Sequence, residues 1–98
     1  MPNHMQVYWS KAAKQDRYEI ALYISQKNVD AACNLLDKLD NAARKLRDFP
    51  YIAPEGRVKG TREFVVHSHY ILVYEVHNNI VIILAVLHTS KQYPHLVQ

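Results

Sequence analysis

The sequence predicts an α+β domain: an N-terminal strand, an antiparallel helical hairpin, and then a three-stranded antiparallel meander. Two patterns indicate this fold class. Apolar residues recur at helical spacing from 31 to 49, whereas from 61 to 88 three apolar runs alternate with short polar turns. A chain of 98 residues, 49% hydrophobic and with only two Gly and four Pro, suits one compact domain over residues 1–98.

The N-terminal half is expected to contain one short strand and two helices. Residues 5–9 (MQVYW) should form the strand, and Ser10 is placed to cap a first helix that stops by Asn28. Asp30 is expected to cap the second helix. The link between the helices is two or three residues long, so they should pack as a hairpin. The apolar stripe of the second helix consists of Ala32, Leu35, Leu36, Leu39, Ala42, Ala43, Leu46 and Phe49.

The C-terminal half is expected to be β structure. Pro50 and Pro54 end the second helix and open a loop. Strands are then predicted over residues 61–67, 70–77 and 80–88. The turn between the last two strands consists of two asparagines, which tolerate the positive φ of a tight hairpin.

Strict alternation assigns the strand side chains to two faces. It places Ile82 on the core face of the last strand and Ile83 on the opposite face, and both faces of this strand are apolar. Two helices can cover only one face of such a sheet, so the other should be an uncovered apolar patch that binds a partner. The alternative is that loops and the tail fold over it. The patch consists of Ile71, Val73, Val81, Ile83 and Leu87.

Composition limits the function classes without choosing among them. The net charge of +3 and a pI of about 9.1 are compatible with RNA, DNA or an acidic protein as partner. The single cysteine, Cys33, allows no internal disulfide, and the N-terminal segment has no apolar signal core, so a cytoplasmic protein is expected. A predicted turn separates His67 from His69, so no metal site and no cofactor are expected.

Two segments carry residues with acid–base or phosphate-binding chemistry. One is GRVKGTREF and the other is HTSKQYP at the end of the last strand. Cleavage of RNA through its 2′-OH requires a base, an acid and cations, which these segments supply. The same side chains could equally form the contacts with a protein partner. The candidates are Arg57, Lys59, Arg62, His88, Lys91 and Tyr93.

Taken together, these segments resemble a known family. The pattern GRVKGTREFVV, YILVYEV and IVIILAVLHTSKQYP, after a strand–helix–helix start, is similar to the RelE/ParE superfamily of bacterial type II toxins, and most similar to its ParE and plasmid-stabilisation branch. The resemblance runs from about Val7 to Pro94. It implies a helical hairpin packed on an antiparallel sheet, and a cognate antitoxin that wraps the toxin with a helix and an extended segment. The basic charge favours an acidic antitoxin.

The superfamily has two modes of action. RelE-type members cut mRNA in the ribosomal A site, whereas ParE-type members poison DNA gyrase. The mRNA-cutting branch typically has an arginine at the start of the middle strand, where this chain has Ile71, which cannot stabilise a phosphorane. The chain also departs from the ParE branch, with Ala85 and Lys91 where arginine is common.

The resemblance therefore implies a gyrase inhibitor that acts by binding. Its target contacts are expected to be Arg57, Lys59, Arg62, His88 and Lys91. The uncovered patch is expected to be the floor of the antitoxin site. The alternative is a ribosome-dependent mRNA endoribonuclease, with His88 as base, Tyr93 as acid, and Arg57, Arg62 and Lys91 as charge stabilisers.

Overall fold

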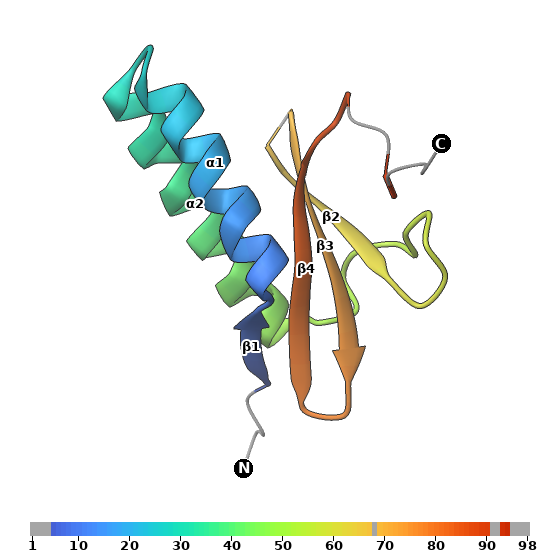
Figure 1. The fold of residues 1–98 in the computed structure, drawn as a ribbon. Coiled ribbons are helices and arrows are strands. Elements are labelled where there is room, and N and C mark those ends of the chain that lie inside the picture. Colours follow the sequence, from blue (N-terminus) through green and yellow to red (C-terminus); the bar gives the residue numbers. More distant parts are fainter. Residues whose placement is uncertain (1–4, 68, 91–92, 95–98) are drawn as a thin grey trace.

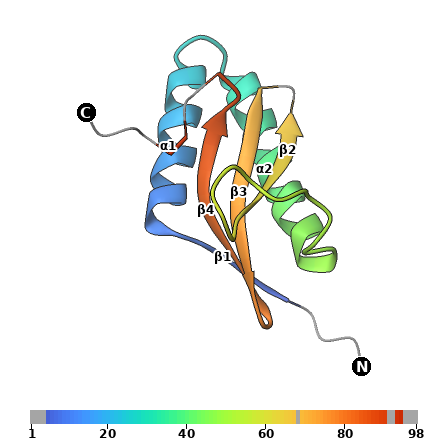
Figure 2. The ribbon, with the colours of Figure 1, turned by 90° about the vertical axis from the view of Figure 1, so that its right-hand side faces the viewer.

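The computed structural model describes residues 5–67, 69–90 and 93–94. It has two layers, a helical hairpin and a sheet, and the loop between α2 and β2 lies on the face of the sheet away from the hairpin (Figures 1 and 2). This arrangement confirms the predicted α+β fold. The elements are β1 (Gln6–Trp9), α1 (Lys11–Ser25), α2 (Val29–Asp48), β2 (Arg62–His67), β3 (Tyr70–His77) and β4 (Ile80–His88).

The sheet has the strand order β1-β4-β3-β2. The last three strands form the predicted antiparallel meander, and β1 adds to it in parallel beside β4. A parallel pair needs a crossover connection, and the chain between β1 and β4 includes the hairpin that covers the sheet. Asn78 has φ 51°, which agrees with the predicted asparagine turn between β3 and β4.

Polar caps define where both helices begin. The Ser10 Oγ accepts a hydrogen bond from the Ala13 N–H at 3.0 Å, so the predicted first cap is confirmed. The prediction of Asp30 as the second cap is wrong. Asn28 takes that place and accepts from the Ala31 N–H at 3.0 Å, because the helix begins two residues earlier than expected. Asp30 instead lies in the first turn of α2, where the helix dipole stabilises a carboxylate.

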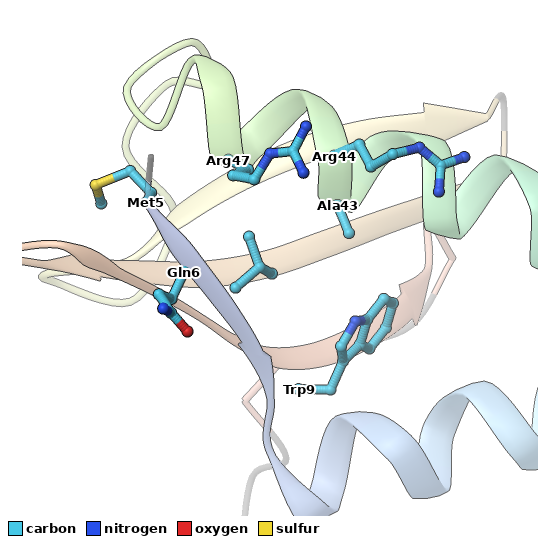
Figure 3. A pocket seen from close by; sticks show the side chains of 7 residues that line it. Met5, Gln6, Trp9, Ala43, Arg44 and Arg47 are labelled. Carbon is cyan, nitrogen blue, oxygen red and sulfur yellow. The ribbon is translucent and has the colours of Figure 1, made fainter. Parts of the chain in front are cut away.

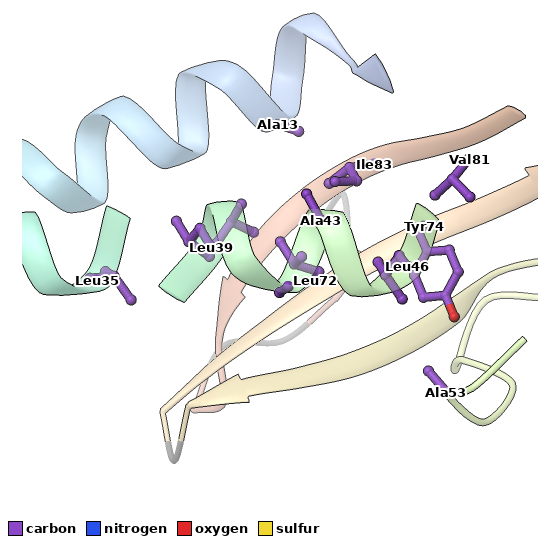
Figure 4. Close-up of a cluster of buried hydrophobic side chains, with 12 residues drawn as sticks. Ala13, Leu35, Leu39, Ala43, Leu46, Ala53, Leu72, Tyr74, Val81 and Ile83 are labelled. Carbon is purple, nitrogen blue, oxygen red and sulfur yellow. The ribbon is translucent and has the colours of Figure 1, made fainter. Parts of the chain in front are cut away.

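The main core lies between the hairpin and the sheet (Figure 4). The stripe on α2 supplies Leu39 and Leu46, both fully buried. Each such side chain contributes about 1.5–3 kcal/mol by leaving water. Tyr74 is buried among them, and its hydroxyl donates to the Pro50 carbonyl at 2.7 Å.

An extra residue in β4 breaks the alternation of its side chains. Val73 pairs with Ala85 but the next residue, Tyr74, pairs with Ile83, so Leu84 forms a β-bulge. The side chains that face the hairpin therefore change from odd to even positions across Leu84.

The bulge corrects the predicted strand faces. Val81 and Ile83, expected on the uncovered face, are fully buried in the core beneath the hairpin. Beyond the bulge, Val86 continues that core face. Ile82, predicted to point into the core, belongs to neither buried cluster and is half-buried.

The opposite face of the sheet is apolar but covered. Ile71, Val73 and Leu87 lie there as predicted, together with Ala85, and none is more than 9% exposed. Tyr93 packs against this second cluster. The predicted uncovered patch is therefore wrong, because Tyr93 packs on this face and the loop between α2 and β2 lies over it (Figure 2).

A pair of charge insertions in β4 tests the bulge. Ile83→Asp should prevent folding or lower the free energy of unfolding by more than about 4 kcal/mol, because it buries an unpaired carboxylate. Ile82→Asp, one residue away, should lower it by about 1–2 kcal/mol, a common loss for a half-buried site. Urea denaturation measures both values. Equal losses, or a larger loss at Ile82, would contradict the assigned faces.

Candidate functional site

The segment GRVKGTRE forms a tight turn before β2. The Gly56 N–H donates to the Thr61 carbonyl at 2.7 Å, and the Thr61 hydroxyl donates to the Val58 carbonyl at 2.6 Å. A Cβ on Gly56 would lie 2.6 Å from the Thr61 Oγ1, and Gly60 has φ +85°. Both glycines are therefore required by the turn itself.

Arg57 is bound to a carboxylate within this turn. Its Nε and Nη2 donate to the two carboxylate oxygens of Glu63 at 2.9 and 2.8 Å, and its backbone N–H donates to the same group at 2.9 Å. These bonds lower the pKa of Glu63 and raise the pKa of Arg57. This bidentate geometry is the arrangement in which guanidinium and carboxylate bind most strongly.

Arg62 also has a role inside the protein. Its Nη1 donates to the Ala53 carbonyl at 2.6 Å, and its guanidinium lies 5.0 Å from the centroid of the Tyr51 ring. The side chain therefore ties the loop after α2 to the start of β2. Lys59 differs, since it is exposed and no side-chain partner for it is found in the described part of the chain. Lys91 lies outside the described residues.

His88 is held at the end of β4 by its neighbours. Its Nδ1 lies 3.1 Å from the Ser90 backbone N–H and 2.7 Å from the Ser90 Oγ. The ring stacks on His69 with a centroid distance of 5.6 Å, and Tyr70 meets it edge-on at 5.3 Å. Because Nδ1 accepts the backbone N–H, a neutral His88 carries its proton on Nε2. The Nδ1 lone pair, which a general base would need, therefore already accepts a hydrogen bond from Ser90.

His88 and Tyr93, the predicted base and acid, lie on opposite faces of the sheet. His88 lines a pocket beside α1 together with Val86, on the side of the hairpin. Tyr93 packs against the second apolar cluster on the other side, where burial raises its pKa. The two rings are therefore held in different packing environments, and Asp16, which lines the His88 pocket, is the second cause of the raised pKa of Tyr93.

The pocket beside α1 contains residues that the sequence did not single out. It has a volume of about 260 Å³ and lies between α1 and the ends of β3 and β4. Asp16 is fixed there because its Oδ2 accepts the Val86 N–H at 3.0 Å. Burial and, second, the neighbouring Tyr23 raise the pKa of Tyr70. The lining consists of Asp16, Glu19, Ile20, Tyr23, Tyr70, Val86 and His88.

A second groove runs between β1 and α2, with a volume of about 350 Å³ (Figure 3). Its floor is apolar, with Val7 and Trp9 from β1 and Ala43 from α2. Arg44 and Arg47 form its rim, one helical turn apart. The spacing of Arg44 and Arg47 beside the apolar stripe of α2 could be read from the sequence. The pairing of β1 with β4, which places β1 next to α2 and so forms the groove, could not.

Among residues 5–67, 69–90 and 93–94, no group of three or more His, Cys, Asp or Glu side chains could hold a metal ion. In the same residues, no helix is both long enough and apolar enough to cross a membrane.

Comparison with known proteins agrees on one family. Residues 7–93 match the family model of the "ParE toxin of type II toxin-antitoxin system, parDE". A protein of Sinorhizobium fredii named "Putative toxin Y4kP" is 30% identical over 92 residues, which are 93% of this chain and 95% of that protein.

Solved structures agree in fold. A structure titled "Chromosomal ParDE TA system from P. aeruginosa" aligns with a TM-score of 0.75 at 16% identity, over 89% of this chain and 98% of that one. The toxin–antitoxin complex RelBE2 from Mycobacterium tuberculosis aligns with a TM-score of 0.60 at 19% identity, over 87% of this chain and 98% of that one. At such low identity these two alignments establish the fold alone.

The pair of Arg57 and Glu63 predicts a pH dependence of stability. The folded-state pKa of Glu63 is lowered, so its contribution is complete above the unfolded pKa of roughly 4.3 and is lost as the pH falls through the folded value. Glu63→Gln should lower the free energy of unfolding at pH 7 by about 1 kcal/mol, and this loss should shrink below about pH 4. Urea denaturation at several pH values measures it. Glu55→Gln, at an exposed position on the same loop, is the control, and a loss that does not change with pH would contradict the assignment.

Proposed function

The chain belongs to the ParE toxin family of type II toxin–antitoxin systems, and from this premise we propose that it inhibits DNA gyrase by binding, without catalysis. ParE-type toxins are the gyrase poisons of the superfamily. The proposed unit of action is the single domain of residues 1–98, acting in the cytoplasm and neutralised by a cognate antitoxin.

The different packing of His88 and Tyr93, one in the pocket beside α1 and the other on the second apolar cluster, supports the choice of binding over catalysis. General acid–base catalysis requires both groups within hydrogen-bonding reach of one substrate. His88 instead faces the pocket beside α1, and Tyr93 packs on the second apolar cluster. Arg57 and Arg62 are bound to protein groups, so neither is free to stabilise a phosphorane without breaking these bonds.

The loop from 49 to 61 is the proposed surface for the target. Arg57 and Arg62 act indirectly by fixing its shape, and Lys59 supplies an exposed charge. Three large apolar side chains are exposed at the start of this loop, a composition that suits the centre of a protein interface. They are Phe49 at 60%, Tyr51 at 65% and Ile52 at 47% exposed.

The groove between β1 and α2 is the proposed antitoxin site. Its apolar floor and its rim of Arg44 and Arg47 are complementary to an apolar segment that carries acidic residues. This location replaces Val81 and Ile83, which are core residues. A role of Ile71, Val73 and Leu87 in antitoxin binding would require Tyr93 to leave the second cluster.

Induction of the toxin without its antitoxin tests the target. We expect DNA breaks, an SOS response and filaments while translation continues, and purified toxin should trap gyrase on cleaved DNA. Lys59→Glu should weaken gyrase binding about tenfold, as reversal of an interface charge adds repulsion. Lys14→Glu, on the exposed side of α1, should not change it.

An immediate arrest of protein synthesis without DNA damage would contradict the gyrase proposal. Cuts in mRNA at the ribosomal A site would then establish the endoribonuclease alternative, with loss of cleavage in His88→Ala as its signature. Thermal unfolding of each variant separates a lost contact from a lost fold.

Charge reversal on α2 tests the antitoxin site. Arg44→Glu and Arg47→Glu together should weaken the antitoxin complex by about tenfold or more, because the groove would then repel an acidic segment. Lys45→Glu is the matched control, since Lys45 is exposed on the same helix and does not line the groove. Isothermal titration calorimetry measures both affinities. Equal losses in the double variant and the control would show that the groove has no special part in binding.

A further inference from the structure

Trp9 is the largest side chain that lines the groove between β1 and α2, and it is half-buried at the end of β1. The guanidinium of Arg17, on α1, lies over its indole at 4.9 Å from the ring centroid. We infer that Arg17 and Asp40 are positioning residues for Trp9, and that through it they set how tightly the groove binds a partner segment of apolar and acidic residues. The inference rests on the function proposed for this groove and adds two residues that do not line it.

Arg17 joins three elements of the fold beside Trp9. Its Nη1 donates to the Asp40 Oδ1 at 2.6 Å, which links α1 to α2, and its stack on the indole links both helices to β1. The Arg17 side chain is 26% exposed and that of Asp40 is 43% exposed. A planar guanidinium can bond a carboxylate at its edge while its face stacks on an aromatic ring. Asp40 therefore holds Arg17 where its cation lies over the indole.

The stacked cation restricts the indole. Trp9 packs against the main core on one side only, because it is half-buried, so its rotamer is not fixed by close packing alone. A cation over an aromatic ring favours the stacked arrangement about two- to fivefold at exposed sites. In this arrangement the indole lies across the groove from Arg44 and Arg47 (Figure 3). Arg17 therefore keeps Trp9 where it can contact a bound segment.

An ordered Trp9 raises the affinity of the groove. Tryptophan and arginine are the side chains that most often dominate the binding energy of protein interfaces, and this groove combines one tryptophan with two arginines. An apolar side chain of the partner would pack on the indole and Val7, while a neighbouring carboxylate would meet Arg44 or Arg47. A side chain that is already ordered loses less entropy on binding. Arg17 thus acts on affinity without touching the partner.

The fluorescence of the free protein tests the positioning. The chain has a single tryptophan, so its emission reports on this position alone. Arg17→Gln removes the cation and Asp40→Asn removes the charge that anchors it, so each should increase the amplitude of the fast anisotropy decay of Trp9 about twofold or more. Arg17→Lys keeps a cation and should retain most of the native decay. A decay in Arg17→Gln and Asp40→Asn equal to that of the native chain would overturn the inference.

A pair of blocked peptides tests the effect on binding. N-acetyl-Leu-Glu-Leu-Glu-Leu-amide should change the Trp9 emission in a saturable way, and its glutamine counterpart should bind at least about threefold more weakly. Arg17→Gln should weaken the glutamate peptide about two- to fivefold, and Arg17→Lys should lie between this variant and the native chain. Thermal unfolding checks that each variant is folded at the assay temperature.

Two neutralised carboxylates on α2 separate positioning from overall charge. Asp40→Asn and Asp37→Asn both remove one negative charge, so charge alone would make both variants bind the acidic peptide more tightly. Asp37 is exposed one helical turn before Asp40 and does not contact Arg17. Only Asp40→Asn loses the anchor of Arg17, so it should bind the peptide about twofold or more weakly than Asp37→Asn.

The outcomes distinguish this inference from the function on which it rests. Equal affinities in Asp40→Asn and Asp37→Asn, with a native chain that prefers the glutamate peptide, would overturn the positioning role and leave the groove as proposed. A native chain whose Trp9 emission responds to neither peptide, or equally to both, would overturn the function proposed for the groove and the inference with it. Should Arg17→Gln fail to fold, the comparison of the two aspartate variants still decides the question.

Discussion

The hydrogen bond from the Ser10 hydroxyl to the Leu84 carbonyl, 3.2 Å long, lies where three parts of the fold meet. The same oxygen caps α1 by accepting the Ala13 N–H, and the Ser10 N–H donates to Ile83 at 2.8 Å. β1 therefore ends, α1 begins and β4 bulges at one point. The bulge changes which side chains of β4 face the hairpin, so the positions of the core, of His88 and of the covered face all depend on it.

The positions of the candidate functional residues follow from that change of face. Beyond Leu84, Val86 and His88 turn toward α1, where Asp16 and Tyr70 also lie, whereas Ala85 and Leu87 turn toward Tyr93. In the sequence, His88 and Tyr93 look like members of one compact cluster of catalytic residue types. In the structure they contact two different surfaces. Arg57 and Arg62 are likewise used to hold a loop in shape. What remains accessible is suited to recognition of proteins.

The order of elements could be read from the sequence because periodicity and turn residues report on local structure. The strand faces could not, because both faces of β4 are apolar and no polar residue marks the change of phase at Leu84. The roles of Arg57 and Arg62 depend on Glu63 and on the Ala53 carbonyl, and residue types alone do not distinguish an internal partner from an external one. The pocket beside α1 joins residues 16–23 with 70–88, a long-range contact that needs the register of the sheet.

The most direct test of this account is a set of nuclear Overhauser contacts from the rings of His88 and Tyr93. We predict contacts between His88 and Tyr70, and contacts between Tyr93 and methyl groups of the second apolar cluster. We predict none between the two rings themselves. A His88–Tyr93 contact in the folded chain would place the base and the acid on one face and would contradict the claim that this toxin acts by binding alone.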